Sequence, residues 1–281
     1  MCCASALVTN GRLIVCLTAG LVLAACAGTP PPAPVEETPA AAPEPDPAPA
    51  PTPLPPPEPD KSTFRISIAS VGDMMIGTDF PENHLPDDDG AGFLRHVTPV
   101  LSKADIAFGN LEGVLVDGGE PAKKCKNPSA CYLFRSPTRY AGHYAKAGFD
   151  VLSLANNHAR DFGEEGRTST MEALDAVGIH HSGRVGEFAS FELNGLKIAV
   201  LAYAVTKESN MLLDYEFAFA TVAVHAANHD IVIVSFNGGA EGVDATNLPF
   251  DEEEYYGEPR CDVVMFARGM VDAGADLVIG H

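Results

Sequence analysis

The sequence predicts an α/β fold, because strand-like and helix-like segments alternate from Phe64 onwards. The strand candidates are 64–71, 105–109, 149–154, 196–204, 230–236 and 276–280. The helix candidates, with apolar residues at helical spacing, are 91–102, 138–147, 164–177, 215–228 and 260–274. A further β-type run at 188–194 reaches Gly195 just before the fourth strand, which predicts a hairpin and therefore a mixed sheet.

The first three strand candidates each end in a short polar motif. ISIASV precedes Gly-Asp-Met-Met at 72–75, DIAFG runs into Gly-Asn-Leu-Glu at 109–112, and DVLSLA precedes Asn-Asn-His at 156–158. A fourth polar residue, His281, follows the run ADLVI. The carboxyl ends of strands in an α/β sheet border one crevice, so these carboxylate, amide and imidazole groups should converge. Such donors without thiolate suit Mn, Fe or Zn, and the sequence therefore predicts a divalent metal site.

The last helix candidate is the clearest, because its apolar residues repeat at helical spacing and Gly274 ends it. The chain then stops at His281, directly after a buried-strand pattern. A sheet left open there would expose an edge and an apolar face. We therefore expect the sequence to be a fragment of a longer protein, with a fold that is incomplete at its carboxyl end.

Residues 1–25 have the pattern of a lipoprotein signal peptide. Arg12 is followed by LIVCLTAGLVLAA, which is too short to span a bilayer. The sequence Leu-Ala-Ala-Cys at 23–26 resembles a bacterial lipobox, which predicts an exported protein anchored to the membrane through lipid on Cys26. Ala27 after the anchor resembles the outer-membrane sorting pattern, with the protein facing the periplasm. The alternative is an ordinary cleaved signal in which Cys26 is incidental.

Residues 26–62 form a Pro/Ala-rich segment that holds most of the 23 prolines, and such a composition predicts a disordered, extended linker. The globular domain is expected at 63–281. The formal net charge of −20 argues against a nucleic-acid partner, because phosphate binding needs clustered Lys and Arg.

Cys125 and Cys131 lie in one polar loop, and an oxidising compartment would allow them to form a disulfide. A thiolate metal site is the weaker alternative, because the spacing is not Cys-x-x-Cys. Cys261 has no partner in the sequence and is expected to be a buried free thiol.

The chain resembles the CapA family of capsule and poly-γ-glutamate synthesis proteins, within the calcineurin-like metallophosphoesterase superfamily. The resemblance rests on VGDMMIG, ADIAFGNLEG, FDVLSLANNHARDFG, GIHHSG, DIVIVSFNGG and GADLVIGH, which occur in family order between about Phe64 and His281. It implies a four-layer αββα sandwich of the metallo-dependent phosphatase type, with mixed sheets and a metal site on the loops that follow the strands.

The resemblance also implies roles for individual residues. Asp73, Glu112 with Asn110 beside it, Asn157 and His281 match metal-site positions, and His158 matches the acid that protonates the leaving group. Asn237 stands where the family usually has a metal-binding His, and an amide oxygen binds borderline metals more weakly. Met75 stands where ordinary phosphoesterases of the superfamily carry a His.

Each candidate also has a structural interpretation. Asp73 could be a turn residue, Glu112 a cap or the partner of a Lys, and Asn157 with His158 an Asx turn with a satisfied imidazole. His180 and His181 are expected to be structural, and His225 and His229 to cap helix carbonyls. The acidic run 251–254 is expected to be a solvated loop face.

Two functions remain open at this point. The first is a cell-envelope protein of capsule or poly-γ-glutamate synthesis that uses a metallophosphoesterase-type site and meets an anionic surface polymer or its synthesis machinery. The alternative is a non-catalytic, lipid-anchored component that binds or assembles such a polymer on a degraded metallophosphatase scaffold.

Overall fold

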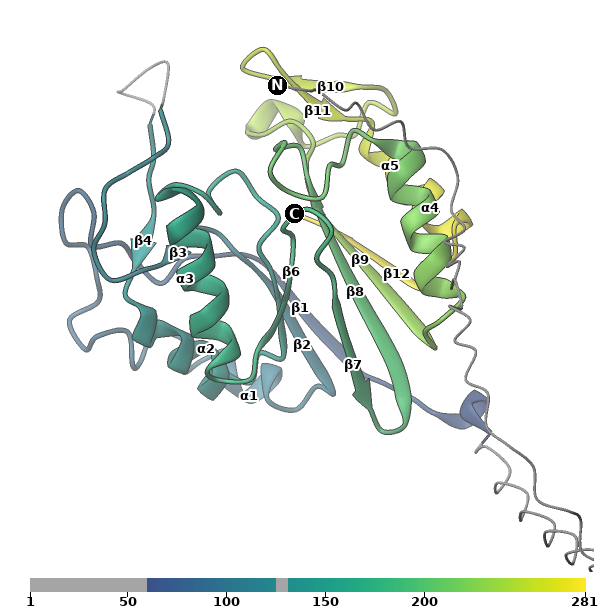
Figure 1. Cartoon of the computed structure of the whole chain (residues 1–281), viewed down its shortest axis with the longest axis horizontal. Coiled ribbons are helices and arrows are strands. Elements are labelled where there is room, and N and C mark those ends of the chain that lie inside the picture. The colour runs from purple at the N-terminus through teal and green to yellow at the C-terminus, as the bar shows by residue number, and fades with distance from the viewer. Residues whose placement is uncertain (1–59, 125–130) are drawn as a thin grey trace, which may run out of the picture. The chain divides into compact units, whose positions relative to one another are not determined.

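The computed structural model describes residues 60–124 and 131–281, which form two four-stranded β-sheets with helices outside them (Figure 1). The strands are β1 Ile68–Met74, β2 Ile106–Leu111, β3 Val114–Leu115, β4 Arg135–Ser136, β5 Val151–Ser153, β6 His180–Ser182, β7 Ala189–Leu193, β8 Leu196–Ala204, β9 Ile231–Asn237, β10 Glu253–Tyr255, β11 Glu258–Cys261 and β12 Leu277–Gly280. The helices are α1 Thr98–Leu101, α2 Ala141–Ala147, α3 Gly163–Asp175, α4 Tyr215–Ala226 and α5 Val263–Asp272, with short 3₁₀ helices at Lys61–Thr63, Thr138–Tyr140 and Val243–Ala245.

The first sheet has the order β1-β2-β5-β6 and is parallel throughout. The second sheet has the order β12-β9-β8-β7, in which only the β7–β8 pair is antiparallel. Asn194 and Gly195 join that pair with φ values of 52° and 81°, and a two-residue hairpin turn of this kind needs positive φ at both positions. The predicted hairpin and mixed sheet are therefore confirmed.

Three apolar clusters show that the fold has four layers. Ile106 and Phe108 of β2 are buried with Ile198 and Val200 of β8, which places one cluster between the sheets. A second cluster lies where α1, α2 and α3 cover the first sheet, and a third lies where α4 and α5 cover the second. Apolar strand residues on both faces of each sheet are thereby buried. The αββα sandwich is confirmed.

Two segments differ from the prediction made for them. The expected helix 91–102 is reduced to α1, because 86–97 forms a series of i→i+3 turns and Pro99 favours the first turn of a helix over its interior. The expected loop at 251–254 contains strand β10, in which Glu253 is buried and accepts a 2.9 Å hydrogen bond from the backbone N–H of Ala240. The interpretation of that run as fully solvated was therefore wrong at Glu253.

The predicted start of the last helix was also early. Arg260 and Cys261 belong to β11, and α5 begins after Asp262, whose carboxylate caps the helix by accepting from the backbone N–H of Met265. The predicted first strand is shifted as well, because β1 runs to Met74 and includes Asp73 at its end.

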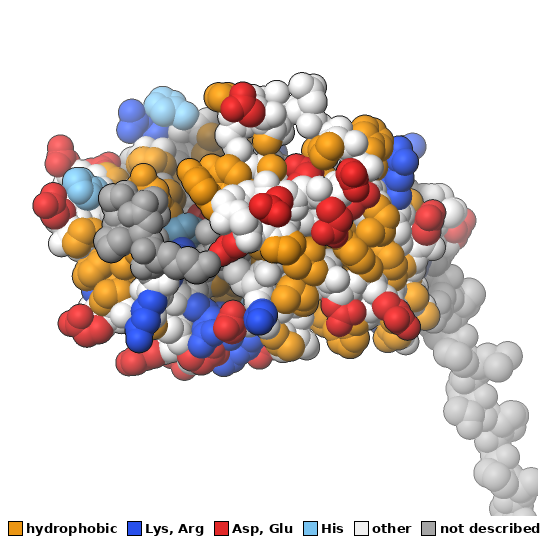
Figure 2. All heavy atoms as spheres, turned by 90° about the horizontal axis from the view of Figure 1, so that it is seen from above, with side chains coloured by type: hydrophobic (Ala, Val, Ile, Leu, Met, Phe, Trp, Pro, Cys, Tyr) orange, Lys and Arg blue, Asp and Glu red, His pale blue; other side chains and the backbone are white. Residues whose placement is uncertain are grey.

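The segment before β10 exposes several apolar side chains, among them Val243, Leu248 and Phe250. On the face shown in Figure 2, apolar side chains lie among acidic ones, and Lys and Arg side chains are interspersed with both. The segment therefore buries only part of its apolar surface against the domain.

The predicted signal peptide 1–25, most of the linker 26–62, and the residues Cys26 and Cys125 lie outside the described residues. Lipidation of Cys26 and the pairing of Cys125 with Cys131 stay predictions. Among the described helices, none combines the length and the apolar character that crossing a membrane requires.

Cys261 is a buried free thiol, as predicted. Burial raises the pKa of its thiol to about 11, although a hydrogen bond from the Tyr215 hydroxyl opposes the rise. The thiolate is the reactive form, so only about 0.1% of the thiol is ionised at about pH 8. We expect alkylation of Cys261 by iodoacetamide to be slow in the folded protein and fast in urea. Peptide mass spectrometry can measure this site by itself, and equal rates in both conditions would contradict the buried position.

Candidate functional site

The polar strand ends of the two sheets meet at one edge of the sandwich. Asp73 lies at the end of β1 and pairs in register with Asn110 at the end of β2. In the second sheet, β9 ends at Asn237, and β12 pairs with β9 as far as Gly280 and Phe236, which places His281 beside Asn237. His281 Nδ1 lies 3.4 Å from Asp73 Oδ1. This contact joins the two sheets at the predicted crevice.

Asn110 is fully buried and organises the carboxylates of the first sheet. Its Nδ2 donates to Asp73 Oδ1 over 2.8 Å and to Glu112 Oε2 over 2.6 Å. Its Oδ1 accepts from Asn156 Nδ2 over 3.0 Å. Both ends of the amide are therefore engaged, so Asn110 orients the two carboxylates, and its oxygen keeps one lone pair beyond the bond from Asn156.

The two carboxyl groups differ in their protonation. The contact with His281 and the hydrogen bond from Asn110 hold the pKa of Asp73 below its usual range, against the opposing effect of partial burial. Burial raises the pKa of Glu112 to about 7, and the negative charge of Asp73 adds to that rise. The site is thus short of positive charge around Glu112, because two carboxylates share one small polar network.

His158 is held by a buried carboxylate that the sequence analysis did not select. Its Nδ1 lies 2.8 Å from Oδ2 of Asp161, a residue with no exposed surface, and its ring packs against Phe134 at 4.4 Å between centroids. A carboxylate only accepts, so we place the imidazole proton on Nδ1. That tautomer leaves Nε2, which hydrogen-bonds to no described residue, as the nitrogen that can exchange a proton with a substrate.

Lys123 completes this group from a separate loop. Its ammonium lies 3.3 Å from Asp161 Oδ1 and 3.2 Å from the backbone oxygen of Asn157. It also lies 3.4 Å from His158 Nδ1, a longer contact than the 2.8 Å between that nitrogen and Asp161. The loop is fixed in place because the backbone N–H groups of Ala122 and Lys123 donate to the backbone oxygen of Asp161. Asp161 therefore balances its buried charge with Lys123 and holds His158 at the same time.

The two residues of the Asn-Asn-His motif occupy different environments. Asn156 is buried, donates to Asn110, and closes an Asx turn by accepting from the backbone N–H of His158 over 3.0 Å. The side chain of Asn157, which was the predicted ligand, is exposed. Gly183 allows a close approach to the backbone just before this turn, because a Cβ at that position would lie 2.4 Å from the backbone nitrogen of Ala155.

The residues at the strand ends can be compared with what a divalent ion requires. Among the described residues, Asn237 Oδ1 is buried without a hydrogen-bond partner, and the buried His281 Nδ1 has only the long 3.4 Å contact with Asp73. A nearby cation would offset the free-energy cost of leaving these atoms so. No three His, Cys, Asp or Glu side chains of the described residues stand close enough to hold a metal by themselves. An ion would therefore need the amide oxygen of Asn237 in addition to Asp73 and His281. These donors fit a single divalent ion such as Mn, Fe or Zn.

Sequence reasoning missed Asn156, Asp161 and Lys123. Asn156 was within a motif already selected, and Asp161 follows His158 by three positions in the same motif. For Lys123 no signal was present, because its place depends on how a loop without periodic pattern pairs with the 158–161 turn.

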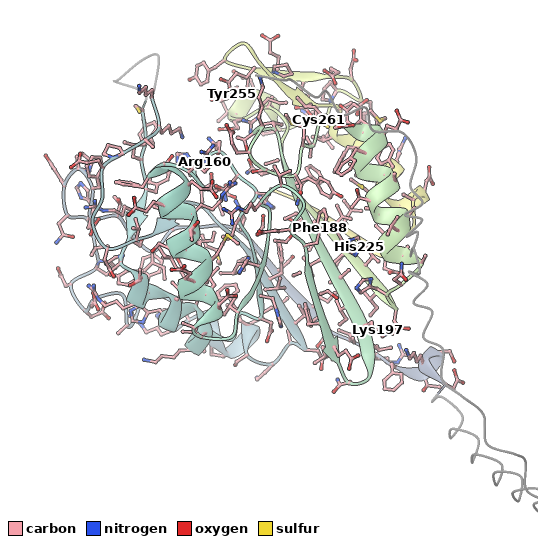
Figure 3. All side chains as sticks on the ribbon, viewed as in Figure 1. Arg160, Phe188, Lys197, His225, Tyr255 and Cys261 are labelled. Carbon is pink, nitrogen blue, oxygen red and sulfur yellow. The ribbon has the colours of Figure 1, made fainter. Side chains whose placement is uncertain are left out.

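The four histidines that were expected to be structural pack against other rings or form polar contacts. His225 of α4 packs the edge of its ring on Phe188 at 5.2 Å between centroids (Figure 3), and its backbone oxygen lies 3.0 Å from His229 Nδ1. His180 stacks on Phe191, and His181 lies 3.2 Å from Asp175. Met75, which follows β1, is 41% exposed and points no polar atom at the site.

Comparison with known proteins identifies the relatives of this chain. The capsule biosynthesis protein CapA of Bacillus anthracis is 28% identical over 240 residues, which cover 77% of this chain and 54% of that protein. The PGA biosynthesis protein CapA of Bacillus subtilis (strain 168) is 26% identical over 233 residues, covering 77% and 57%. The chain thus spans about half the length of these curated relatives. A hypothetical protein from Thermus thermophilus aligns over 76% of this chain and 67% of its own, with 14% identity and a TM-score of 0.42.

A protein-family model described as "Bacterial capsule synthesis protein PGA_cap" matches residues 67–281, which include every described strand, the five α-helices and all the strand-end residues of the candidate site. The chain therefore belongs to the bacterial capsule synthesis protein family PGA_cap.

Proposed function

We propose that this chain is a cell-envelope protein of capsule-type surface polymer synthesis that carries a metallophosphoesterase-type hydrolytic site. Membership of the PGA_cap family and the capsule and PGA synthesis names of its relatives support the polymer pathway. The contact that joins Asp73 of one sheet to His281 of the other, beside the His158–Asp161 pair, is the observation that supports a hydrolytic site. Lipid on Cys26 would anchor the domain to a membrane of the cell envelope.

Each residue of the proposed site would have a separate role in hydrolysis. Asp73, Asn237 and His281 would hold the ion, and Asn110 keeps the carboxylates of Asp73 and Glu112 in place. When bound, a divalent ion such as Mn, Fe or Zn supplies Lewis-acid chemistry that polarises an ester or amide. As a water molecule attacks the ester or amide, His158 would protonate the departing group from Nε2, while Asp161 holds Nδ1–H and stabilises the imidazolium that gives up the proton.

One observation favours the non-catalytic alternative. A site that needs the amide oxygen of Asn237 has one imidazole fewer than a site with His at this position, and an amide binds borderline metals more weakly. A chain that binds no ion would use the same crevice to bind or assemble polymer. Metal stoichiometry separates the two functions.

Titration of the full chain with Mn²⁺ tests the proposed site. Mn²⁺ prefers oxygen and nitrogen ligands, so the cysteines of the chain compete little for it. We expect calorimetry to give one weakly bound ion per chain, and slow hydrolysis of a generic phosphodiester. Loss of an outer-shell partner alone costs about 10- to 100-fold in metal affinity, so Asp73→Asn should cost at least as much. Asn237→His should strengthen binding.

Asp87→Asn is the matched control for that experiment. It removes the same charge as Asp73→Asn, but from an exposed residue away from the strand ends. Equal Mn²⁺ affinity in the Asp73 and Asp87 variants would rule out the assignment of the site. Brisk hydrolysis with two tightly bound ions would show that the site is a more complete phosphatase centre than its residues suggest.

A further inference from the structure

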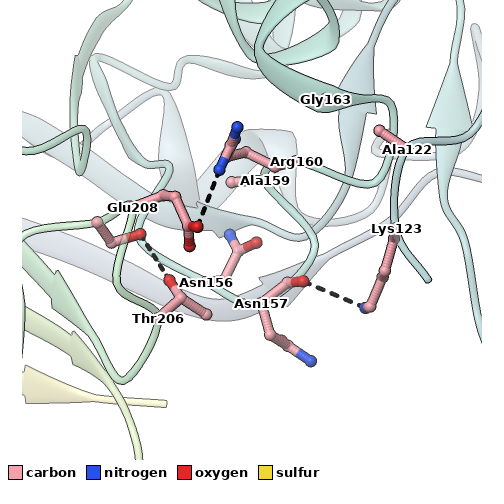
Figure 4. A pocket seen from close by; sticks show the side chains of 10 residues that line it. Ala122, Lys123, Asn156, Asn157, Ala159, Arg160, Gly163, Thr206 and Glu208 are labelled. Atoms are coloured by element: carbon pink, nitrogen blue, oxygen red, sulfur yellow. Dashed lines mark hydrogen bonds and ion pairs between the residues drawn. The ribbon is translucent and has the colours of Figure 1, made fainter. Parts of the chain in front are cut away.

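A cavity of about 290 Å³ lies beside the candidate site, between the segment 156–163 and the segment 206–209 (Figure 4). The residues that matter for its chemistry are Lys123, Asn156, Arg160, Thr206, Glu208 and Ser209. The volume is at the small end for ligand sites, which suits one polar group of a larger molecule. Its floor includes Asn156, which donates to Asn110 and thereby links the cavity to the carboxylates at the strand ends.

Two cations line this cavity in a chain whose acidic side chains outnumber its basic ones by 38 to 18. Lys123 is held at the rim by the backbone oxygen of Asn157 and by the buried Asp161, and its side chain keeps 27% exposure. A lysine that is already fixed loses less conformational entropy when it binds a ligand than one that moves freely. The cavity therefore offers a positioned positive charge next to His158.

Arg160 supplies the second cation. Its Nε lies 3.3 Å from Glu164 Oε2, and its guanidinium is also paired with Glu208. The Nη1–Oε1 distance is 3.1 Å, and Figure 4 shows this pair across the cavity from Lys123. Both side chains are well exposed, at 38% and 51%, so the pair is worth little and its carboxylate can be displaced. Thr206 Oγ1 donates to Ser209 Oγ over 2.9 Å, which leaves the Ser209 hydroxyl proton available to a ligand.

We propose that this cavity is a subsite for a small oxyanion of the substrate, a carboxylate or a phosphate, which Lys123 and Arg160 bind while Glu208 moves aside. The inference rests on the proposed function in one respect: it places the charged part of the substrate beside His158. Charge-assisted hydrogen bonds from Lys and Arg are the interactions that such groups require. In the absence of ligand, Glu208 is paired with Arg160. An oxyanion must therefore compete with this carboxylate in order to bind Arg160.

Binding of inorganic phosphate and of glutarate to the metal-free protein tests the subsite, with the neutral diamide of glutarate as the control ligand. Calorimetry on wild type and Lys123→Met should show a loss of affinity of about tenfold for the oxyanion that binds. Lys124→Met is the matched control, because it removes the same charge from the exposed neighbouring residue. It should leave the affinity for the oxyanion unchanged. Preference for phosphate or for glutarate identifies the source of the oxyanion.

Because Lys123 also pairs with the buried Asp161, a second variant is needed that leaves that pair intact. Glu208→Gln removes the carboxylate that pairs with Arg160 Nη1 and leaves the contact of Arg160 with Glu164 in place. It should strengthen oxyanion binding, whereas Glu165→Gln, in the first turn of α3, should not. Binding of neither probe, or equal weakening by Lys123→Met and Lys124→Met, would overturn the proposal. Lys123-dependent binding in a chain that neither binds Mn²⁺ nor hydrolyses esters would retain the subsite and reject the hydrolytic function.

Discussion

His158→Ala is expected to lower phosphodiester hydrolysis by about 100-fold or more while leaving the affinity for Mn²⁺ unchanged. The size follows from the usual contribution of a positioned general acid, about 10² to 10⁴ in rate. Metal affinity should persist because the Nδ1 atom of His158 faces Asp161, 2.8 Å away, and the candidate ligands come from other strand ends. A steady-state assay beside calorimetry measures both quantities on the same sample.

His84→Ala is the control for this prediction, because His84 lies in the 78–86 loop with 67% of its side chain exposed. Asp161→Asn is the informative partner, since it keeps the shape of the carboxyl group and removes its charge. It should reduce the rate, because an uncharged neighbour stabilises the imidazolium less. If His158→Ala keeps full activity, His158 has no part in the chemistry, and if that variant loses Mn²⁺, His158 is a ligand.

The layers of the fold could be predicted from the sequence because they depend on periodic apolar patterns. Runs such as Leu196–Ala204 are apolar on both faces, and the structure buries them between a sheet and a helix layer. The hairpin could be predicted from Asn194-Gly195, which supplies both positive φ angles. By contrast, β10 and β11 contain Glu253 and Arg260, whose burial depends on tertiary partners that no period reveals.

The same distinction applies to the candidate site, where strand order could be predicted but turn and loop contacts could not. Strand topology brings Asp73, Asn110 and His281 to one edge, and strand order is what an alternating α/β pattern conveys. Which Asn of the pair faces inward depends on the Asx turn at 156–158, and Lys123 arrives through loop hydrogen bonds to Asp161. Short-range turn geometry and loop pairing are set by individual hydrogen bonds, so a residue pattern does not determine them.

The packing of helix α5 against the second sheet can be tested at Phe266, whose ring contacts a strand that ends in the candidate site. Phe266 of α5 has no exposed surface, and its ring meets those of Tyr203, Tyr215, Phe219 and Phe236 at centroid distances of 5.4–6.4 Å. Phe236 precedes Asn237 on β9, so the same ring cluster supports a candidate metal ligand. We therefore expect a change at Phe266 to affect both folding stability and the strand end.

Phe266→Ala should lower the free energy of unfolding by about 3–5 kcal/mol, because it removes a fully buried ring and leaves a cavity among other rings. That is a large part of the roughly 5–15 kcal/mol that stabilises a typical domain. Urea unfolding followed by circular dichroism measures the change, and Phe266→Leu, which fills more of the space, should lose less. Val271→Ala on the same helix is the control: its side chain is 55% exposed, and the expected change is within about 0.5 kcal/mol. Equal losses in the Phe266→Ala and Val271→Ala variants would mean that α5 does not cover the second sheet as the structure describes.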